Sequence, residues 1–560
     1  MNNTSPKIIL IGMIVLIVAA PIAVGSVYIV TYSAMELLIF SLLLLHLWTT
    51  DFAVGQKTRD ILPVFWPARS IEQGATYLRG TLLLMVPLFL FLMFCLFQMI
   101  PLPLSFLQKL SPGTTAFYAR LGLSPSLHAP SSMLHAPCSY LHAPNSMLHA
   151  PCSLLPLTLS LSATSTALLK WFAYASVFFL AATFPPHRSL LPLIVALFVV
   201  GFAEAVYGLS GYLNQSDYLL WFRKKYYLDS VTGTYINRNH FAGLMSLCIP
   251  VSLGLFATRI GSRAGHYGAL SLYFLFLGLV VMVLGLIFSM SRMGQFSLFA
   301  GIVFVGALYI ASLVRRGRRR GSMLVIASLL VLCLGGLWGT WKGLGPVEER
   351  WKTIEASYED RSIIWQSTIK LFRNFPLAGT GLGTYELAYP PYKPDKLGAV
   401  IVDHAHNDYL EFLSEVGLAG FIPWLAFFLL FLVFTIRAWF RRRNTFSIFI
   451  GAGGLAATVA LLVHSLADFN LQIPANAMLL FLVMGLTWRV VNTSMEQKSS
   501  MEHGATEAAR SDRSSTEHRA WSKRSSMERQ KQHGAWSMEM FKVQSSRFKV
   551  RKRGGFNIEH

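Results

Sequence analysis

Two histidines stand just before a long apolar run, in the order His404-Ala-His406-Asn407-Asp408-Tyr409. An unperturbed imidazole titrates near neutral pH, so the most economical role for a histidine here is that of a general base. The apolar residues from Tyr409 onward repeat at helical spacing, and Asn407 or Asp408 suits the N-cap, which places both histidines at a helix N-terminus. The partial positive charge and free N–H groups of such an end favour an anionic ligand.

Two other roles for this pair of histidines remain open. A metal site would need a nearby aspartate as a further ligand, and the spacing differs from that of the HExxH zinc motif, so we expect no metal and no other cofactor. The imidazoles could instead have a structural role, with their hydrogen-bond partners inside the protein core. Because His404 and His406 are two residues apart, their side chains should point in different directions if the segment is extended.

Hydrogen-bond donors gather where an external loop enters the sixth apolar run, in the order Asn237-Arg238-Asn-His240. A cation costs little at this wet interface, and Arg238 could simply reach lipid headgroups. Because four donors adjoin one another, we favour contact with a ligand. At the outer end of the eleventh run, Asp468 follows His464 by four residues, and ionisable groups at that depth indicate the lining of a site.

Two further arginines stand in predicted external segments. Arg292 lies in the short external turn 290–294, where a cation goes against the positive-inside bias, which favours function over an interfacial anchor. Arg361 lies in the first turn of an amphipathic helix predicted over 358–372, and a salt bridge to one of the two acidic residues before it is the alternative. A guanidinium group offers a planar fork of donors to phosphate oxygens, so both arginines indicate a diphosphate ligand.

The glycines at 379, 381 and 383 resemble a dinucleotide fingerprint. No βαβ unit surrounds them, so we predict a flexible loop. Tyr389 and Tyr392, which follow this loop, could form an aromatic wall for a sugar or simply pack the loop.

The elements that position these residues are membrane helices. Of the 560 residues, 54% are hydrophobic and 13% charged, with a mean hydropathy of +0.49, whereas soluble domains contain about 25% charged residues. We predict an all-α polytopic membrane protein with about 12 transmembrane helices. A large periplasmic loop, 342–416, separates helices 9 and 10. The apolar runs cover residues 8–30, 33–49, 80–100, 167–184, 189–211, 240–258, 268–289, 295–313, 322–341, 417–436, 446–465 and 475–490.

Basic residues occupy every second connection between these runs, as the positive-inside rule expects of cytoplasmic loops. We therefore attribute the net charge of +21 to topology and not to nucleic-acid binding. Both termini are then cytoplasmic, and the connections 212–239, 290–294 and 342–416 are external. The first run follows a lone Lys7 and shows no clear cleavage site, so we predict a retained span.

Two segments stand apart from the predicted transmembrane domain, 1–490. Residues 127–154 repeat a heptad of the form LHAPxSx, and a proline in each unit prevents a regular helix that would align its histidines. Read from the opposite DNA strand, one repeat unit translates into the sequence found at 533–539. We interpret both as copies of one genomic repeat, the first in an external loop and the second in a disordered, basic cytoplasmic tail, 491–560.

The residues around the histidines resemble the O-antigen ligase family, whose signature region also occurs in O-antigen polymerases and protein O-oligosaccharyltransferases. The most specific element is His406-Asn407 followed by nine residues and then Gly417-x-x-Gly420. The family-like core covers residues 200–480.

Other residues support the resemblance and receive roles from it. The sequences around Arg292 and Arg361 are similar to those around the two arginines that the family uses on a lipid-linked diphosphate. The short sequence that contains Arg238 is common among members of the family. The resemblance implies that His406 orients or deprotonates an acceptor hydroxyl, while Arg292 and Arg361 stabilise the departing diphosphate with help from Arg238. Substrate contacts are then expected from Asn237, Arg238, His240, His404, Asn407 and Asp468.

The implied activity is a metal-independent, inverting transfer of a saccharide from an undecaprenyl-diphosphate carrier at the periplasmic face of the bacterial inner membrane. The acceptor, which is a glycan, a glycolipid or a protein, decides between a ligase, a polymerase and a protein O-oligosaccharyltransferase. A membrane transporter is the alternative from another class, and it predicts broken helices and charges at mid-membrane. Here the candidate charges gather at the outer interface, which favours chemistry on a lipid-linked glycan.

Overall fold

The computed structural model describes residues 5–60, 68–120, 154–184, 187–260, 266–315, 347–398 and 401–493. This part of the chain forms an all-α polytopic membrane protein, in which eleven helices are long and apolar enough to cross a membrane. These helices are α1 (Ser5–Ile22), α2 (Ile29–Asp60), α3 (Ala68–Gln98), α6 (Leu161–Thr183), α7 (His187–Leu213), α8 (Arg238–Ile260), α9 (His266–Phe288), α10 (Arg292–Arg315), α14 (Asp408–Phe440), α15 (Thr445–His464) and α16 (Pro474–Asn492). The span predicted over 322–341 lies outside the described residues.

The first predicted span differs from the observed helix. This span, 8–30, is in fact α1, which ends at Ile22, followed by the 3-10 turn η1 (Val24–Ser26) and the start of α2. Gly25 inside this turn has φ +67°, a conformation that ends a helix and that favours glycine. The tenth predicted span, 417–436, is the part of α14 that follows a break at Gly417, and the part before the break is the helix predicted to begin after Asn407 or Asp408.

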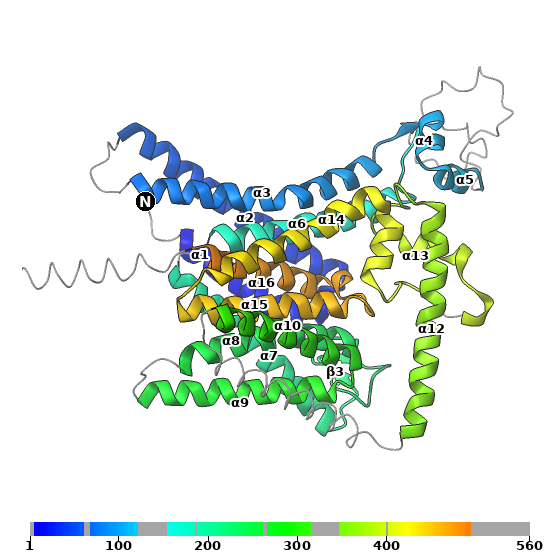
Figure 1. Cartoon of the computed structure of the whole chain (residues 1–560). Coiled ribbons are helices and arrows are strands. Elements are labelled where there is room, and N and C mark those ends of the chain that lie inside the picture. The colour runs from blue at the N-terminus through cyan, green and yellow to red at the C-terminus, as the bar shows by residue number, and fades with distance from the viewer. Residues whose placement is uncertain are drawn as a thin grey trace, which may run out of the picture. The chain divides into compact units, whose positions relative to one another are not determined.

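The spanning helices lie side by side, with α15 and α16 in the middle and α3 and α9 on opposite flanks (Figure 1). Almost every residue of α16 is buried, and it packs against α6 and α15, while α15 packs against α8 and α10. Aromatic rings fill the space between α6, α14 and α16, where Trp171 contacts Phe412, Trp424 and Phe481 edge to face. Helices α8 and α15 are therefore both anchored in the buried centre of the helix bundle.

Short elements cover one end of the helices. Between α3 and α6 lie β1 (Leu102–Pro103), α4 (Leu104–Leu110), α5 (Pro112–Arg120) and β2 (Leu154–Leu155), and between α7 and α8 lie β3 (Tyr218–Leu219) and β4 (Phe222–Arg223). Before α14 lie α12 (Val347–Asn374), α13 (Tyr385–Ala388), η3 (Pro390–Tyr392) and η4 (Asp395–Leu397), while η5 (Asn470–Gln472) joins α15 to α16. Strands β1 and β2 pair antiparallel, as do β3 and β4. Of the heptad repeat 127–154, only Leu154 lies within the described residues.

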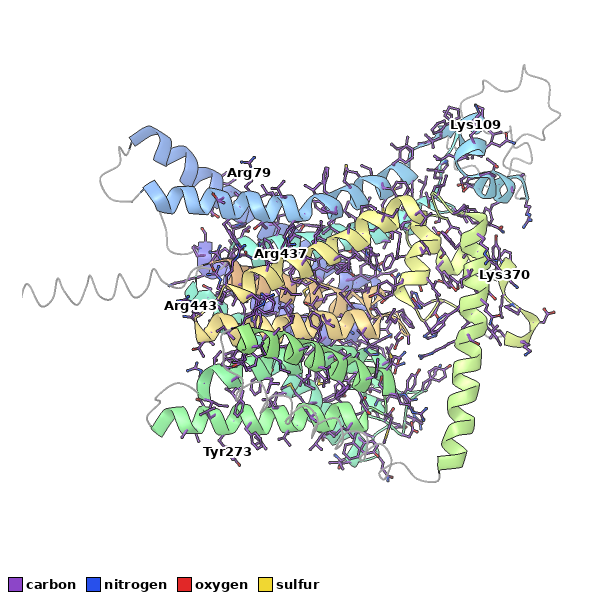
Figure 2. The ribbon with its side chains drawn as sticks, viewed as in Figure 1. Arg79, Lys109, Tyr273, Lys370, Arg437 and Arg443 are labelled. Atoms are coloured by element: carbon purple, nitrogen blue, oxygen red, sulfur yellow. The ribbon has the colours of Figure 1, made fainter. Side chains whose placement is uncertain are left out.

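Charged residues separate by end in the way that the predicted topology requires. Arg79, Arg437 and Arg443, all assigned to cytoplasmic connections, lie at one end of the helices, and Lys109 and Lys370 lie at the other (Figure 2). The second end also carries α4, α5, α12 and α13 (Figure 1). This separation agrees with the alternating scheme, and we use "outer end" below for the end that carries α12.

Candidate functional site

The segment that contains the two histidines is held by the first turn of α14. Asn407 is the N-cap, and its side-chain oxygen accepts a hydrogen bond from the N–H of Leu410 at 3.1 Å, which confirms one of the two predicted caps. Glu411 reaches back and accepts the N–H of Ala405 at 2.7 Å. His406 itself has φ +50°, a left-handed conformation that a histidine adopts only where its surroundings require it. Asn407 therefore shapes the backbone around His406.

Three imidazoles converge on the ring of Phe469. His404 stacks on this ring at 4.3 Å between centroids, while His406 and His240 meet it edge to face at 5.0 and 4.6 Å. The expectation of different directions for His404 and His406 held only for an extended segment, and the left-handed conformation of His406 shows that the segment is not extended there. Phe469 is thus the centre of a histidine cluster, which we define as His240, His404, His406 and His464 with Asp468 and Phe469.

Asp468 is the charge inside this cluster. Its side chain is 1% exposed, and its Oδ1 lies 3.6 Å from Nδ1 of His406 and 3.9 Å from Nε2 of His240. Its Oδ2 lies 3.9 Å from Nε2 of His464. Burial alone would raise the pKa of Asp468, but the three imidazoles outweigh that effect and hold the pKa well below its usual range. Asp468 is therefore a carboxylate at neutral pH, aimed at the ring of His406.

His404 carries the opposite charge. Its Nδ1 lies 2.8 Å from Oε1 of Glu411, and its side chain is 29% exposed. Burial alone would lower the pKa of His404, but the carboxylates of Glu411, Asp403 and Glu415 outweigh it and raise the pKa to about 9. His404 is thus an imidazolium at neutral pH that donates to Glu411, and the two form an ion pair at the start of α14.

This ion pair should make the stability of the protein depend on pH. The imidazole of the unfolded chain titrates near ~6.5, and that of the folded chain at about 9. The stabilisation is therefore complete below about pH 6.5 and is lost as the pH rises through 9. We expect the difference in Tm between the wild type and His404→Gln, measured by thermal unfolding in detergent, to narrow over that range. A difference that is the same at both ends of the range would contradict this assignment.

Arg361 holds the segment that carries Asp468. Its Nη1 donates to the carbonyl oxygen of Ala467 at 2.7 Å, and Trp365, one turn later on α12, donates from Nε1 to the carbonyl oxygen of Ala405 at 3.0 Å. The predicted position of Arg361 in the first turn of its helix was wrong, because α12 begins at Val347. The side chains proposed as alternative salt-bridge partners lie outside the described residues. One helix thus fixes two of the three segments that carry the histidine cluster, the one before α14 and the one after α15.

The donors at the start of α8 divide into two groups. Asn237 accepts the N–H of Asn239 at 2.8 Å, so it closes a local turn, while His240 is buried against Phe469. The guanidinium of Arg238 lies 5.3 Å from the centroid of the Tyr227 ring. Burial raises the pKa of Tyr227, and the charges of Arg238 and Arg361 counter that effect while Asp468 adds to it. Arg238 and Asp468 therefore both contribute to the electrostatic environment of Tyr227.

Arg292 lies at the margin of this arrangement. It is the first residue of α10 and its side chain is exposed. Ser291 donates to the side-chain oxygen of Asn239 at 2.8 Å, which sets the start of α10 against the start of α8. The start of α10, which carries Arg292, therefore lies against the start of α8, which carries Arg238 and His240.

The comparison with known families decides the nature of this region. Residues 277–425 match the family model described as O-antigen ligase. Over these residues the chain is similar to O-antigen ligases. The match agrees with the resemblance that the motif His406-Asn407…Gly417-x-x-Gly420 indicates, and it also includes Arg292 and Arg361. No curated protein matches the chain. The eleven apolar helices and this match are typical of multi-pass membrane proteins of polysaccharide biosynthesis.

The glycines of the O-antigen ligase motif have a structural reason. Gly417 has φ +57° inside α14, and the break frees two N–H groups: those of Leu418 and Ala419 donate to the carbonyl oxygens of Pro376 and Leu377 at 2.9 and 3.0 Å. A Cβ at position 417 would overlap the carbonyl oxygen of Leu377. The break at Gly417 therefore lets the segment that follows α12 bind α14 through backbone hydrogen bonds. Arg361 lies on α12 and the histidines precede α14, so these bonds help to fix their relative positions.

The glycine-rich segment 379–383 is the partner of this break. The predicted flexible loop was wrong: Gly379, Gly381 and Gly383 have positive φ, and the segment is almost wholly buried. The N–H groups of Thr380 and Gly381 donate to the carbonyl oxygens of Ser414 and Glu415 at 3.1 and 2.8 Å. Tyr389 is buried and stacks on Tyr385, so it packs the loop, whereas Tyr392 is half-buried.

Substitution of Gly417 by alanine should destabilise the protein more than the same substitution at Gly398. Both glycines have positive φ, but only Gly417 is also packed closely against another backbone segment. Gly398 has φ +50° and open space around its Cα, so Gly398→Ala incurs backbone strain alone, at about 1–3 kcal/mol. Gly417→Ala adds the overlap with the Leu377 carbonyl and should lower the Tm further. Thermal unfolding of both variants in detergent tests this, and equal losses would mean that the close approach at 417 has no energetic importance.

Four residues of the site were not predicted from the sequence. Phe469 and Glu411 contact the histidines directly, Trp365 donates to the carbonyl oxygen of Ala405, and the ring of Tyr227 faces the guanidinium of Arg238. Only Phe469 had a sequence signal, its position next to Asp468 at the end of an apolar run.

Proposed function

We propose that this protein transfers a saccharide from an undecaprenyl-diphosphate carrier to a hydroxyl group of an acceptor, at the periplasmic face of the bacterial inner membrane. The observation that carries the proposal is the arrangement around Asp468. His406 faces its carboxylate at 3.6 Å, and Arg361 binds the carbonyl oxygen of the preceding residue, Ala467. A base and a cation thus stand at one helix N-terminus in an O-antigen ligase domain.

In this mechanism His406 removes the proton from the acceptor hydroxyl as its oxygen attacks the anomeric carbon of the donor sugar. The bond between that carbon and the diphosphate breaks, and the diphosphate leaves with the electron pair. Asp468 orients the imidazole and stabilises the imidazolium that forms. Attack from the side opposite the diphosphate inverts the anomeric centre.

The cations around the cluster balance the charge that develops on the diphosphate. Arg361 offers the planar fork that suits phosphate oxygens, and Arg238 and Arg292 supply further charge from the starts of α8 and α10. Donors fixed in advance by a folded scaffold need not reorganise during the reaction, which is the main source of electrostatic catalysis.

The proposal is tested by transfer in a purified system. The full-length protein in detergent is mixed with an undecaprenyl-diphosphate oligosaccharide and, separately, with lipid A-core, a second lipid-linked glycan and a pilin-like peptide. Formation of one product supports the proposal and names the acceptor, because a ligase, a polymerase and a protein O-oligosaccharyltransferase differ in this respect. A folded protein that consumes no donor with any acceptor would overturn it.

A further inference from the structure

An open cavity of about 510 Å³ lies at the outer end, between α5 and the last turn of α12. Figure 1 shows these two helices close together near α13, and Figure 2 shows Lys109 and Lys370 at the same end. The cavity does not include any member of the histidine cluster. Its volume falls within the range of about 300–1,000 Å³ that is typical of ligand sites.

The walls of this cavity are built by close packing. Gly113 of α5 lies so near α12 that a Cβ there would overlap the carbonyl oxygen of Asn374, so the two helices meet backbone to backbone. The side chain of Asn374 donates to the hydroxyl of Tyr392 at 2.7 Å, which fixes the opposite wall. Behind it, Phe375 is buried in the small core of this region together with Leu371 and Tyr389.

The chemistry of the lining is one-sided. Arg120 and Arg373 bring guanidinium groups from α5 and α12, and Phe117 and Tyr392 bring aromatic rings. Among the described residues that line the cavity there is no aspartate or glutamate. Guanidinium groups bind carboxylate, phosphate and sulfate through paired donors, and an aromatic ring offers a flat apolar surface to the C–H face of a sugar.

We propose that this cavity, the arginine cavity, binds an acidic sugar residue of a saccharide. The choice of a saccharide rests on the proposed function, and the preference for an acidic one rests on Arg120 and Arg373. Arg361 and Arg373 lie twelve residues apart on α12, which corresponds to about 18 Å along the helix axis. The arginine cavity would therefore hold a sugar that is several units away from the reacting one. Such a contact selects the glycan by its charge pattern without taking part in the chemical step.

The experiment measures binding and not transfer. Isothermal titration of the full-length protein in detergent uses trigalacturonate, a sulfated trisaccharide and a phosphorylated trisaccharide, each beside its neutral counterpart, with an acidic peptide as a further probe. We expect at least one acidic sugar to bind more tightly than its counterpart, and its affinity to fall as salt is added. Equal binding of acidic and neutral sugars, or equal or tighter binding of the peptide, would overturn the proposal.

A matched pair of double variants locates the site. The double variant Arg120→Gln with Arg373→Gln should lower the affinity for the preferred acidic sugar at least about tenfold, which is the effect of losing one charged hydrogen bond. Lys109→Gln with Lys370→Gln removes the same charge from α4 and α12 outside the cavity and should leave the affinity within about twofold. Equal loss in both would show a diffuse field and no site. Tm values establish that each variant is folded.

The outcomes separate this proposal from the proposed function. His406→Asn should bind the acidic sugar with wild-type affinity, since its side chain lies outside the cavity. Binding without transfer would reject the proposed reaction alone. Transfer with no charge-selective binding would reject the arginine cavity alone.

Discussion

Replacement of His406 by asparagine or alanine should reduce the rate of glycan transfer by about 10²–10⁴-fold, which is the usual contribution of a positioned general base. The reason is that His406 is the imidazole whose Nδ1 faces the Asp468 carboxylate and whose ring is partly exposed. The asparagine variant is the sharper test, because asparagine tolerates the left-handed conformation that His406 adopts and so preserves the backbone at φ +50°. The measurement is the initial rate with the acceptor identified in the transfer assay.

The control for this substitution is His46→Gln. His46 lies on α2, where Nε2 is 3.0 Å from the hydroxyl of Thr183, and a glutamine can keep that hydrogen bond. Its variant should transfer at the wild-type rate. If His406→Asn is folded, as judged by its Tm, and still transfers at the wild-type rate, His406 is not the base. A loss with alanine alone would then point to a role of His406 in shaping the backbone.

The membrane-spanning helices could be predicted from the sequence because their signal is local. Each needs about 20 apolar residues in a row, and the described spans agree with the predicted runs to within a few residues, apart from the first. That error has a local cause as well, because the turn that contains Gly25, with its positive φ, ends α1 early. The polar turns of α14 before Gly417 were predicted too, since Asn407 caps them.

The histidine cluster could be predicted only in part, because its members come from separate segments. The start of α8 supplies His240, the segment before α14 supplies His404 and His406, and the end of α15 leads to Asp468. Each was recognisable by its residue type at an outer helix end. Their convergence on Phe469 was not, since no spacing rule connects positions that far apart in the chain.

The glycine-rich segment shows a different limit. Glycines in a row indicate positive φ, and the structure has positive φ at each of Gly379, Gly381 and Gly383. However, the wide range of backbone conformations open to glycine in the unfolded chain does not make this segment mobile in the folded protein. The break at Gly417 exposes N–H and carbonyl groups of α14, and the segment 376–381 satisfies them. That exchange of hydrogen bonds depends on both segments together, so local composition predicts the turn but not its burial.

Replacement of Arg361 by glutamine should lower kcat by about 10²–10³-fold, as removal of one preorganised electrostatic donor does in other enzymes. Arg361→Lys should recover part of this loss, since it restores the charge but not the planar fork. The neutral variant also weakens the bond to the carbonyl oxygen of Ala467, so a structural effect has to be separated from a catalytic one. Steady-state rates, measured over a range of donor concentrations, and the Tm of each variant provide that separation.

A structural role and a charge-balancing role of Arg361 predict different values of Tm and kcat for the lysine variant. If Arg361 only holds Ala467, then lysine, whose single ammonium can donate to that carbonyl oxygen, should restore both Tm and kcat to the wild-type level. If Arg361 also stabilises the leaving diphosphate, lysine should restore the Tm while kcat stays well below that of the wild type. Lys370→Gln, which removes an exposed cation two turns away on α12, should leave both quantities unchanged. Because the wild-type guanidinium uses Nη1 on the protein, its remaining donors are the ones that a diphosphate would take, and a folded Arg361→Gln with wild-type kcat would remove the charge-balancing role from the mechanism.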